Sequence, residues 1–459
     1  GLDEPPPGWE LSRDDDAKPA MMSLLVGAKI ALEGHAPWIA EAGYPVSSMG
    51  QMRVLVTEQK LKIDRGLVYH PKTLVAGVGC ERGKFAAEVI ELIGFALSRD
   101  NLSAQSLAAI ATADIKADEP ALHAAARHFN VPLRLFTVAE LNQERYRLAN
   151  PSAIVEAEVG TPSVAEAAAL KAGKLLVQKL KSQRATCALG KSPRPIEIEN
   201  FGRAPGLLNI VGIGPGDAAT RTISAIRALD QSSDWVGYGL YLDLIEDMRI
   251  SQERHRFELG DEEGRVRHAL ELAASGRKVS LVCSGDGQIY AMAALVYELL
   301  NERGERAVSD AARRVAVEAH PGISAFQAAS AAAGALVGHD FCCISLSDLL
   351  TPREEIVKRL DGAGKADFVT ALYNPRSQKR TRQLAEAALL DDRDDGVVVI
   401  VHVDPVAHVL AAAVELRLDA LDDPCDLAGD ELLDVLARSV VVGAVRQRRG
   451  DTERADPRP

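Results

Sequence analysis

The 459-residue chain is 47% hydrophobic and 26% charged, which is typical of globular domains and allows two to four of them. No apolar run approaches the roughly 20 residues of a membrane span, and the first residues lack the basic and apolar regions of a secretory signal, so we expect a cytoplasmic protein with no membrane partner. The formal charge of −12 disfavours nonspecific nucleic-acid binding, which needs a basic surface.

The cysteines show neither CxxC pairs nor the spacing of zinc ligands. In a cytoplasmic protein this pattern indicates reduced, partly buried thiols. We therefore expect no structural metal. The six positions are Cys80, Cys187, Cys283, Cys342, Cys343 and Cys425.

Residues 1–62 open with a proline-rich, acidic segment and end in a short apolar stretch, Met52–Glu58, that predicts a strand. We expect a small separate module here. From Leu67 the pattern changes to LVYHPKTLVAGVGCERG, which predicts a strand ending at Gly77–Gly83 and is followed by apolar residues at helical spacing. Two further strand and helix units follow, so residues 63–192 are predicted to form one compact α/β domain.

Residues 193–206 are rich in proline and glycine and show no sustained period, which favours an interdomain linker. Beyond it, the strand candidates LLNIVGIG, DWVGYG, KVSLVCSG, VAVEAHPG, FVTALYNP and GVVVIVHV alternate with helical segments. This alternation predicts a mainly parallel sheet with ligands at the carboxyl ends of its strands. The second domain is expected over 207–450, with a tail at 451–459.

The first of these strands ends in GIGPGD, which invites a dinucleotide interpretation. Gly212 and Gly214 fit that fingerprint, but its sixth position is Asp217, which would repel a pyrophosphate. Taken alone, the motif could equally be a tight structural turn. Three further segments, CSGDGQIY, HPGISAF and ALYNP, also follow predicted strands and end them in glycine, proline or small polar residues. We therefore expect the four loops to form one pocket.

Together these loops resemble the tetrapyrrole methylase family. The segments GYGLYLDLI, LGHDFCCISLSDLLTP and ALYNPRSQKR are most similar to its precorrin-3B C-17 methyltransferases. The resemblance implies two α/β subdomains, about 207–320 and 321–450, with S-adenosylmethionine bound in the cleft between them. It also implies a precorrin tetrapyrrole as substrate, methyl transfer with ring contraction, and a homodimer.

The resemblance assigns three groups of residues. Those for the cofactor are Gly214, Pro215, Gly216, Ser284, Gly285, Asp286, Ile289, Ser324, Ala325, Tyr373 and Asn374. Candidates for the acid or base of ring contraction are Tyr238, Tyr241, Asp217 and His339, and candidates for binding the carboxylate-rich substrate are Arg376, Lys379, Arg380 and Asp340. Each group has a structural alternative: a turn-forming aspartate, core tyrosines and a solvated helix start.

Residues from about 67 to 187 resemble the C-terminal domain of the cobalamin-biosynthesis G protein and its small stand-alone relatives, and residues 1–62 resemble part of that protein's central region. The similar segments are LVYHPKTLVAGVGCERG, ATADIKADEPAL, NPSAIVEAEVGTPSVAEAAAL and KLKSQRAT. The resemblance implies a corrinoid-handling domain, in which Arg82, Lys116, Lys179 and Lys181 are candidate partners for corrinoid carboxylates. Thr161 and Ser163 precede a predicted helix and are expected to cap it.

Two domains that resemble proteins of one pathway favour a fused cobalamin-pathway enzyme that methylates precorrin-3B at C-17. Methylation of a cobalt-containing factor or of another ring position is an alternative. A noncatalytic tetrapyrrole carrier is a second alternative, and a dehydrogenase is disfavoured by Asp217.

Overall fold

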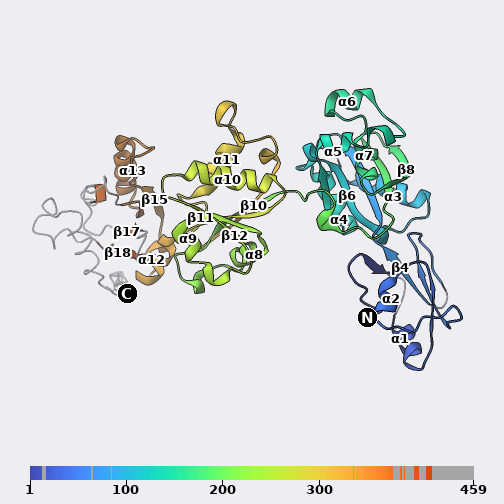
Figure 1. Ribbon diagram of the computed structural model, residues 1–459. Coiled ribbons are helices and arrows are strands. Elements are labelled where there is room, and N and C mark those ends of the chain that lie inside the picture. The colour runs from blue at the N-terminus through green and yellow to red at the C-terminus, as the bar shows by residue number, and fades with distance from the viewer. Residues whose placement is uncertain are drawn as a thin grey trace, which may run out of the picture. The chain divides into compact units, whose positions relative to one another are not determined.

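The protein is described as a computed structural model (Figure 1). The structure describes residues 1–12, 17–63, 66–83, 85–333, 335–375, 383–384, 387, 397–402 and 410–415. The chain divides into two compact units. The first comprises Gly1–Leu207, Leu270–Arg277 and Val308–Ala316, and the second Leu208–Ala269, Lys278–Ala307 and Val317–Pro459.

The first unit begins with a four-stranded sheet in the order β1-β4-β3-β2. Its elements are β1 (Trp9–Leu11), α1 (Ala17–Leu25), β2 (Ile30–Glu33), α2 (Pro37–Glu41), β3 (Met52–Val56) and β4 (Gly66–Pro71). The strand predicted at 52–58 is confirmed as β3. Aromatic packing holds the core, because the rings of Trp38 and Tyr69 meet edge-on at 5.3 Å.

The prediction of one strand in LVYHPKTLVAGVG is wrong, because two strands from different sheets occupy it. The stretch Gly66–Pro71 is β4 of the first sheet, and Leu74–Cys80 is β5 of the next. The chain turns between them, where the Thr73 amide donates to the Pro71 carbonyl oxygen at 2.8 Å. The first sheet therefore extends beyond residue 62.

The second sheet of this unit has the order β7-β6-β5-β9-β8. Strands β5, β6 and β7 run parallel, whereas β9 runs antiparallel to both β5 and β8. The strands are β5 (Leu74–Cys80), β6 (Leu107–Ala113), β7 (Leu133–Phe136), β8 (Lys174–Lys181) and β9 (Ala185–Lys191). Strand β9, which lies between β5 and β8, was not predicted from the sequence.

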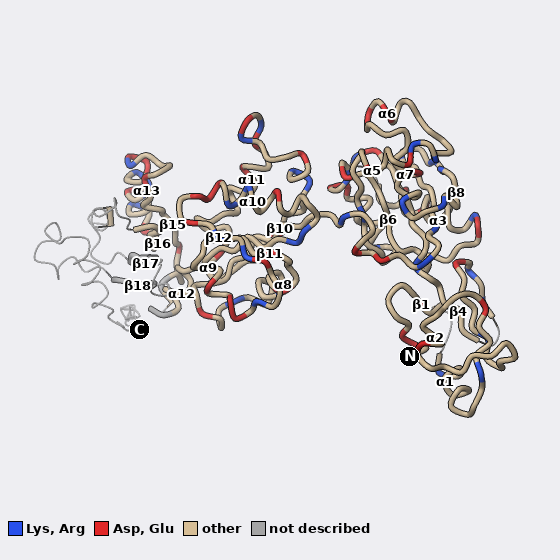
Figure 2. Tube along the Cα trace, viewed as in Figure 1, with Lys and Arg blue, Asp and Glu red and all other residues tan. Residues whose placement is uncertain are grey.

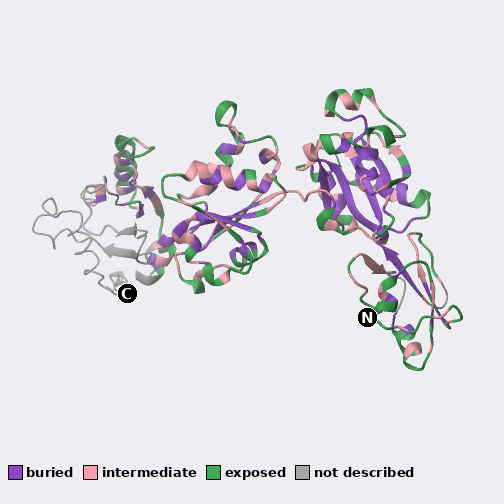
Figure 3. Ribbon diagram, viewed as in Figure 1, coloured by how far each residue is buried: buried purple, intermediate pink, exposed green. Residues whose placement is uncertain are grey.

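Helices cover both faces of this sheet, so the α/β class predicted from the sequence is confirmed. Helices α3 and α4 lie on the face with the larger hydrophobic core, and α5 and α7 lie on the other. All seven residues of β6 are buried between the layers (Figure 3). The helices are α3 (Ala86–Arg99), α4 (Pro120–Phe129), α5 (Val138–Asn142), α6 (Ala153–Val159) and α7 (Val164–Leu170).

The segment expected to be a linker packs in part against this domain. Phe201 is buried, and its ring meets that of Phe136 edge-on at 5.2 Å. Leu135 and Arg203 exchange backbone hydrogen bonds of 2.8 and 3.0 Å. This part of the segment is therefore held against the sheet.

The second unit contains a five-stranded sheet in the order β12-β11-β13-β10-β14. Its strands are β10 (Leu207–Gly212), β11 (Asp234–Tyr238), β12 (Glu253–Phe257), β13 (Lys278–Cys283) and β14 (Ala316–His320), and its helices are α8 (Ile223–Gln231), α9 (Gly239–Asp243), α10 (Glu262–Ala274) and α11 (Met292–Asn301). Strand β11 pairs in parallel with both β12 and β13. The edge strand β12 was not predicted, because ERHRF carries no apolar run.

A second sheet follows in the order β15-β16-β17-β18. Its elements are α12 (Ala325–Ala333), β15 (Phe341–Ser345), α13 (Arg353–Lys365), β16 (Val369–Tyr373), β17 (Val397–His402) and β18 (Leu410–Glu415). The first three strands are parallel and β18 is antiparallel. The mainly parallel arrangement predicted from the sequence is confirmed for these strands.

Charged residues of both signs are interspersed along the described chain (Figure 2). Many of them form local ion pairs, such as Arg256 with Asp243 at 2.6 Å and Arg82 with Asp118 at 2.9 Å. Among the described residues, no helix has the length and apolar character needed to cross a membrane.

Candidate functional site

The loops after β10 and β13 are joined directly through their backbones. The Gly214 amide donates to the Gly285 carbonyl oxygen at 3.1 Å, and the Gly285 amide donates to the Gly214 carbonyl oxygen at 2.8 Å. Both residues have positive φ, +80° and +62°, a conformation that favours glycine. The two turns are therefore in direct contact, as the sequence analysis expects.

The loop after β14 closes on the same point. A Cβ added at Gly322 would lie 2.1 Å from the Gly285 carbonyl oxygen, so only glycine fits there. The buried Asp286 carboxylate accepts the Gly322 amide through Oδ2 at 3.1 Å and the Gln288 amide through Oδ1 at 2.8 Å. This carboxylate therefore ties the second loop to the third.

The fourth loop, after β16, contacts the third loop through two hydroxyl groups. The Ser324 and Tyr373 hydroxyl oxygens lie 2.5 Å apart and are both buried. The ring of Tyr290, from the second loop, stands 5.0 Å from that of Tyr373. Burial raises the pKa of the Tyr373 hydroxyl, so this group keeps its proton at neutral pH.

The last residue of this cluster is exposed. Asn374 has φ +52° and its amide nitrogen donates to Ser345 Oγ at 3.1 Å, which links the loop to the end of β15. Tyr290 reaches the same strand, because its hydroxyl donates to the Cys343 carbonyl oxygen at 2.8 Å. The carboxyl ends of β15 and β16 are thus connected to the second loop.

The remaining candidates for the cofactor lie in the same four loops. Pro215, Gly216 and Ser284 are half-buried, and Ala325 is buried. Ile289 packs against the apolar cluster that contains Ala325 and Tyr373. Asp286 is the buried carboxylate among them, whereas Asp217 is exposed. Arg221, at the end of the first loop, forms an ion pair with Asp247 at 3.1 Å.

Two tyrosines among the acid or base candidates lie beside the first two loops. The rings of Tyr238 and Tyr241 meet edge-on at 5.3 Å. Tyr241 packs against the cluster that contains Ile213 and Val282, which precede those loops. Burial raises the pKa of the Tyr241 hydroxyl, so it can donate a proton but does not accept one at neutral pH.

Asp217 has a structural role in its turn. It precedes a 3₁₀ helix, Ala218–Thr220, and its carboxylate accepts the Ala219 amide at 2.9 Å. The Thr220 hydroxyl donates to the Asp217 carbonyl oxygen at 2.7 Å. This exposed carboxylate is a helix cap, as the turn interpretation of GIGPGD expects.

The structure does not bring His339 and Asp340 to the loops. They precede β15, and the Asp340 carbonyl oxygen accepts the Val369 amide at the first residue of β16. The loop residues Ser345 and Tyr373 are at the opposite ends of these five-residue strands. At about 3.3 Å per residue, about 13 Å separates the two ends. Both residues therefore lie outside the loop junction, and the acid or base role of His339 and the substrate-binding role of Asp340 stay predictions.

The basic candidates Arg376, Lys379 and Arg380 lie outside the described residues. Three other contributors were missed by the sequence analysis: Tyr290, Gly322 and Ser345. The glycine of HPG was a visible signal for one of them. The positive φ of Tyr290, +50°, has no signature in the sequence.

In the first unit, acidic side chains contact the loop after β5, which carries the corrinoid-binding candidate Arg82. Arg82 forms an ion pair with Asp118 at 2.9 Å, and the Glu119 carboxylate accepts the Gly83 amide at 3.1 Å. Lys179 donates to the Asn150 carbonyl oxygen. Lys116 ends a 3₁₀ turn, and Lys181 ends β8.

The expectation that Thr161 and Ser163 cap a helix is wrong. Ser163 occupies the position before α7, but its side chain accepts no capping hydrogen bond. Both hydroxyls are buried without a hydrogen-bond partner.

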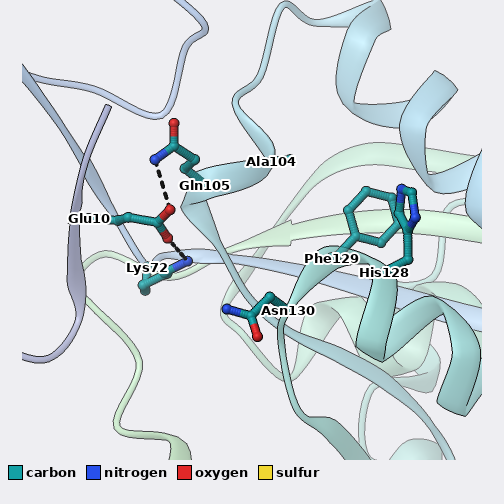
Figure 4. Close-up of a pocket in the computed structure, with 7 residues that line it drawn as sticks. All are labelled: Glu10, Lys72, Ala104, Gln105, His128, Phe129 and Asn130. Atoms are coloured by element: carbon teal, nitrogen blue, oxygen red, sulfur yellow. Dashed lines mark hydrogen bonds and ion pairs between the residues drawn. The ribbon is translucent and has the colours of Figure 1, made fainter. Parts of the chain in front are cut away.

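A cavity of about 170 Å³ lies in the first unit, at the start of β5 and β6 (Figure 4). Glu10 forms an ion pair with Lys72 at 2.6 Å on its wall and accepts the Gln105 side-chain amide at 2.8 Å. His128, Phe129 and Asn130, at the end of α4, complete the lining together with Ala104. The strands β5 and β6 begin at this edge, so the cavity is at the opposite end from the Arg82 loop.

Two known families match separate parts of the chain. Residues 74–190 match "Cobalamin synthesis G C-terminus", and residues 207–403 match "Tetrapyrrole (Corrin/Porphyrin) Methylases".

The chain is also similar to several curated proteins. A probable cobalt-factor III C(17)-methyltransferase of Salmonella typhimurium is 44% identical over 39% of this chain and 72% of its own length. A precorrin-3B C(17)-methyltransferase of Sinorhizobium sp is 42% identical over 40% and 69%. The chain spans only 33% of a cobalt-factor III methyltransferase of Priestia megaterium, with 42% identity over 40% of this chain.

Two solved structures resemble separate parts of the chain. The methyltransferase CobJ is 36% identical, with a TM-score of 0.42, over 48% of this chain and 89% of its own. CobE, a protein of the cobalamin pathway, is 38% identical, with a TM-score of 0.25, over 26% of this chain and 89% of its own.

Proposed function

Because this chain belongs to the tetrapyrrole (corrin/porphyrin) methylases, we propose that it transfers a methyl group from S-adenosylmethionine to C-17 of precorrin-3B, with contraction of the macrocycle, in cobalamin biosynthesis. The observation that carries this proposal is the junction of four loops through Gly214, Gly285, Gly322 and Tyr373. Cobalt-factor III is the second candidate substrate, since relatives of both names match the chain.

The loop residues fit S-adenosylmethionine in two respects. Gly285 leaves open the space where a side chain would meet Ser324 and Ala325, with only ordinary contacts at 3.7 Å around a Cβ. The described loops carry a buried carboxylate, Asp286, and their one described Arg, Arg221, is paired with Asp247, which favours a cationic sulfonium. When bound, the cofactor supplies an electrophilic methyl group.

The protein's own residues would hold the cofactor and orient it toward the substrate. We assign cofactor binding to the backbone of the glycine turns and to the side chains around them: Gly214, Pro215, Gly216, Ser284, Gly285, Asp286, Ile289, Ser324, Ala325, Tyr373 and Asn374. The hydrogen bonds among these loops fix their geometry before a ligand arrives, which lowers the cost of orienting the reactants.

Ring contraction needs a proton donor or acceptor. Tyr238 and Tyr241 are the candidates beside the loops, and the raised pKa of Tyr241 keeps its Oη protonated at neutral pH, so we propose it as a donor and not as a base. Arg376, Lys379 and Arg380 remain the proposed partners of the substrate carboxylates.

We further propose that the first unit handles corrinoids and that the chain acts as a cytoplasmic homodimer. Light scattering would test the dimeric state.

The test is a transfer assay with methyl-labelled S-adenosylmethionine and either precorrin-3B or cobalt-factor III. Label is expected in the product of one substrate, at the mass of a singly methylated, ring-contracted corrinoid. No transfer to either substrate would overturn the activity. Calorimetry then separates the carrier alternative, which predicts corrinoid binding without affinity for S-adenosylmethionine.

A matched pair of variants links the result to the loop junction. Gly285→Val fills the junction, whereas Gly304→Val introduces a side chain at a similar φ, +80°, where nothing lies within 4 Å. Both substitutions carry the same kind of backbone strain. Only Gly285→Val is expected to abolish S-adenosylmethionine binding. Equal binding by the two variants would place the cofactor elsewhere.

A further inference from the structure

Away from the four loops, three potential metal ligands converge at the other end of the first sheet in the second unit. Asp234 and Glu253 are the first residues of β11 and β12, and they stand directly opposite each other in the parallel pair. His255 follows Glu253 by two residues, so the two side chains share a face of β12. Single ligand atoms of the three residues all lie within 4.8 Å of one another.

Two of these groups, Asp234 and His255, are in direct contact. The Asp234 side chain is fully buried, and one carboxylate oxygen lies 3.0 Å from His255 Nε2. His255 Nδ1 lies 3.0 Å from Nε2 of His268 on α10. A neutral His255 can take either of two tautomers here. With the proton on Nε2, it donates to Asp234 and accepts from His268. With the proton on Nδ1, it donates to His268, and Nε2 presents a lone pair on the carboxylate side, where a metal ion can bind.

The third group favours a metal ion over a proton. A proton bridges two atoms, whereas the Glu253 carboxylate brings a third ligand atom to the same place. Two carboxylates directly opposite on paired strands repel each other, and a divalent cation removes that repulsion. Tetrahedral zinc with ligand bonds of about 2.0–2.2 Å would set its ligand atoms about 3.3 Å apart, close to the present oxygen–nitrogen distance.

From this juxtaposition we propose that Asp234, Glu253 and His255 bind one divalent transition-metal ion, such as Zn²⁺ or Co²⁺, that fastens the edge strand β12 to β11. The mixed set of one imidazole and two carboxylates suits these ions better than Mg²⁺, which prefers oxygen ligands and retains water. His268 is a positioning residue, because its hydrogen bond selects the His255 tautomer whose Nε2 binds the metal.

The site lies apart from the proposed chemistry. The cluster lies at the first residues of β11 and β12, whereas Tyr238 is the last residue of β11 and the loops follow the carboxyl ends of their strands. The proposal therefore does not depend on methyl transfer. Its expected effect is on the stability of the edge strand.

The experiment uses the full chain without a histidine tag, after treatment with a chelator. Titration with ZnCl₂ in a calorimeter is expected to show one ion bound per chain at this site, with an increase in melting temperature that grows with zinc concentration. Mg²⁺ is expected to give neither effect. CoCl₂ serves as a visible probe, since its absorption reports the nitrogen and oxygen ligands.

Variants decide whether that ion sits in the cluster. His255→Gln is expected to remove one bound ion, and exposed Glu253→Gln to weaken its binding at least tenfold with little risk to folding. His268→Phe is expected to weaken it about 10- to 100-fold. Glu258→Gln, an exposed acidic residue just after β12, is the matched control and should bind as the unchanged protein does. Absence of zinc binding, or unchanged stoichiometry and affinity in both His255→Gln and Glu253→Gln, would overturn the proposal.

Discussion

Tyr290 and Tyr373 come from different loops, and their ring centroids stand 5.0 Å apart with the ring planes inclined by 48°. Each hydroxyl is bonded outside the pair. Tyr290 donates to the Cys343 carbonyl oxygen at 2.8 Å, and the Tyr373 hydroxyl lies 2.5 Å from Ser324 Oγ. The two rings thereby connect the second, third and fourth loops with the end of β15.

Removing the Tyr373 hydroxyl should loosen this junction. Tyr373→Phe leaves the buried Ser324 hydroxyl without that partner, at a cost of about 1–3 kcal/mol. Tyr290→Phe removes a hydrogen bond at a half-exposed ring and should cost about 0.5–1.5 kcal/mol. Urea unfolding measures both losses, and amide exchange of residues 322–327 reports whether the third loop opens. A greater loss for Tyr290→Phe would contradict this order.

The carboxylate of Asp286 should be irreplaceable by an amide. Asn presents an NH₂ group to one of the two backbone amides, of Gln288 and Gly322, that the carboxylate now accepts. Asp286→Asn is therefore expected to destabilise the second unit by about 1–3 kcal/mol, as measured by urea unfolding.

A matched control for this substitution is Asp217→Asn. Asp217 accepts one amide, that of Ala219, at an exposed helix start, where Asn caps as well as Asp. Its stability should change by less than about 0.5 kcal/mol. Equal losses for the two variants would show that Asp286 does not tie the loops through both oxygens.

Acid should weaken the first unit through Glu166. Burial by itself raises the pKa of this carboxyl, but hydrogen bonds from Asn150 and Lys179 outweigh burial and hold the pKa below its usual 4.5. Because the folded pKa is lowered, the stabilisation is complete above about pH 4.5 and is lost as the pH falls through the folded value. Amide exchange of residues 149–150 and 179 between pH 3 and 7 measures the loss.

Glu166→Gln supplies the comparison. It should destabilise the unit at neutral pH by about 1–3 kcal/mol, because a side-chain amide cannot accept all the donors around the carboxylate. Its stability should also vary less between pH 3 and 5. An equally steep acid loss in this variant would assign the pH dependence to other groups.

Two buried thiols should resist alkylation in the native protein. Burial raises the pKa of Cys187 to about 12 and that of Cys283 to about 11, so neither forms a thiolate at pH 8. Mass spectrometry after iodoacetamide treatment should find both unmodified. In urea both should react, and rapid native labelling of Cys283 would contradict its place in the core of β13.

Local patterns in the sequence were sufficient to predict most strands and the four glycine loops. Apolar runs such as LLNIVGIG and KVSLVCSG have few alternatives to a buried parallel strand, and glycine after such a run indicates a close turn. Strand β12 could not be assigned in this way because it has no apolar run. Strands β4 and β5 could not be separated because they pair in different sheets, and their pairing partners are far away in the sequence.

The sequence by itself determined the α/β class, the family and the loops that the proposed chemistry requires. Only the tertiary structure decided what each side chain in them does. It made Asp217 a helix cap, set Asp286 between two loops, and separated His339 from the other candidates by the length of a strand. It also brought Asp234, Glu253 and His255 together. The physical reason is that glycine turns follow from local sterics, whereas these roles depend on strand register and on contacts between distant segments.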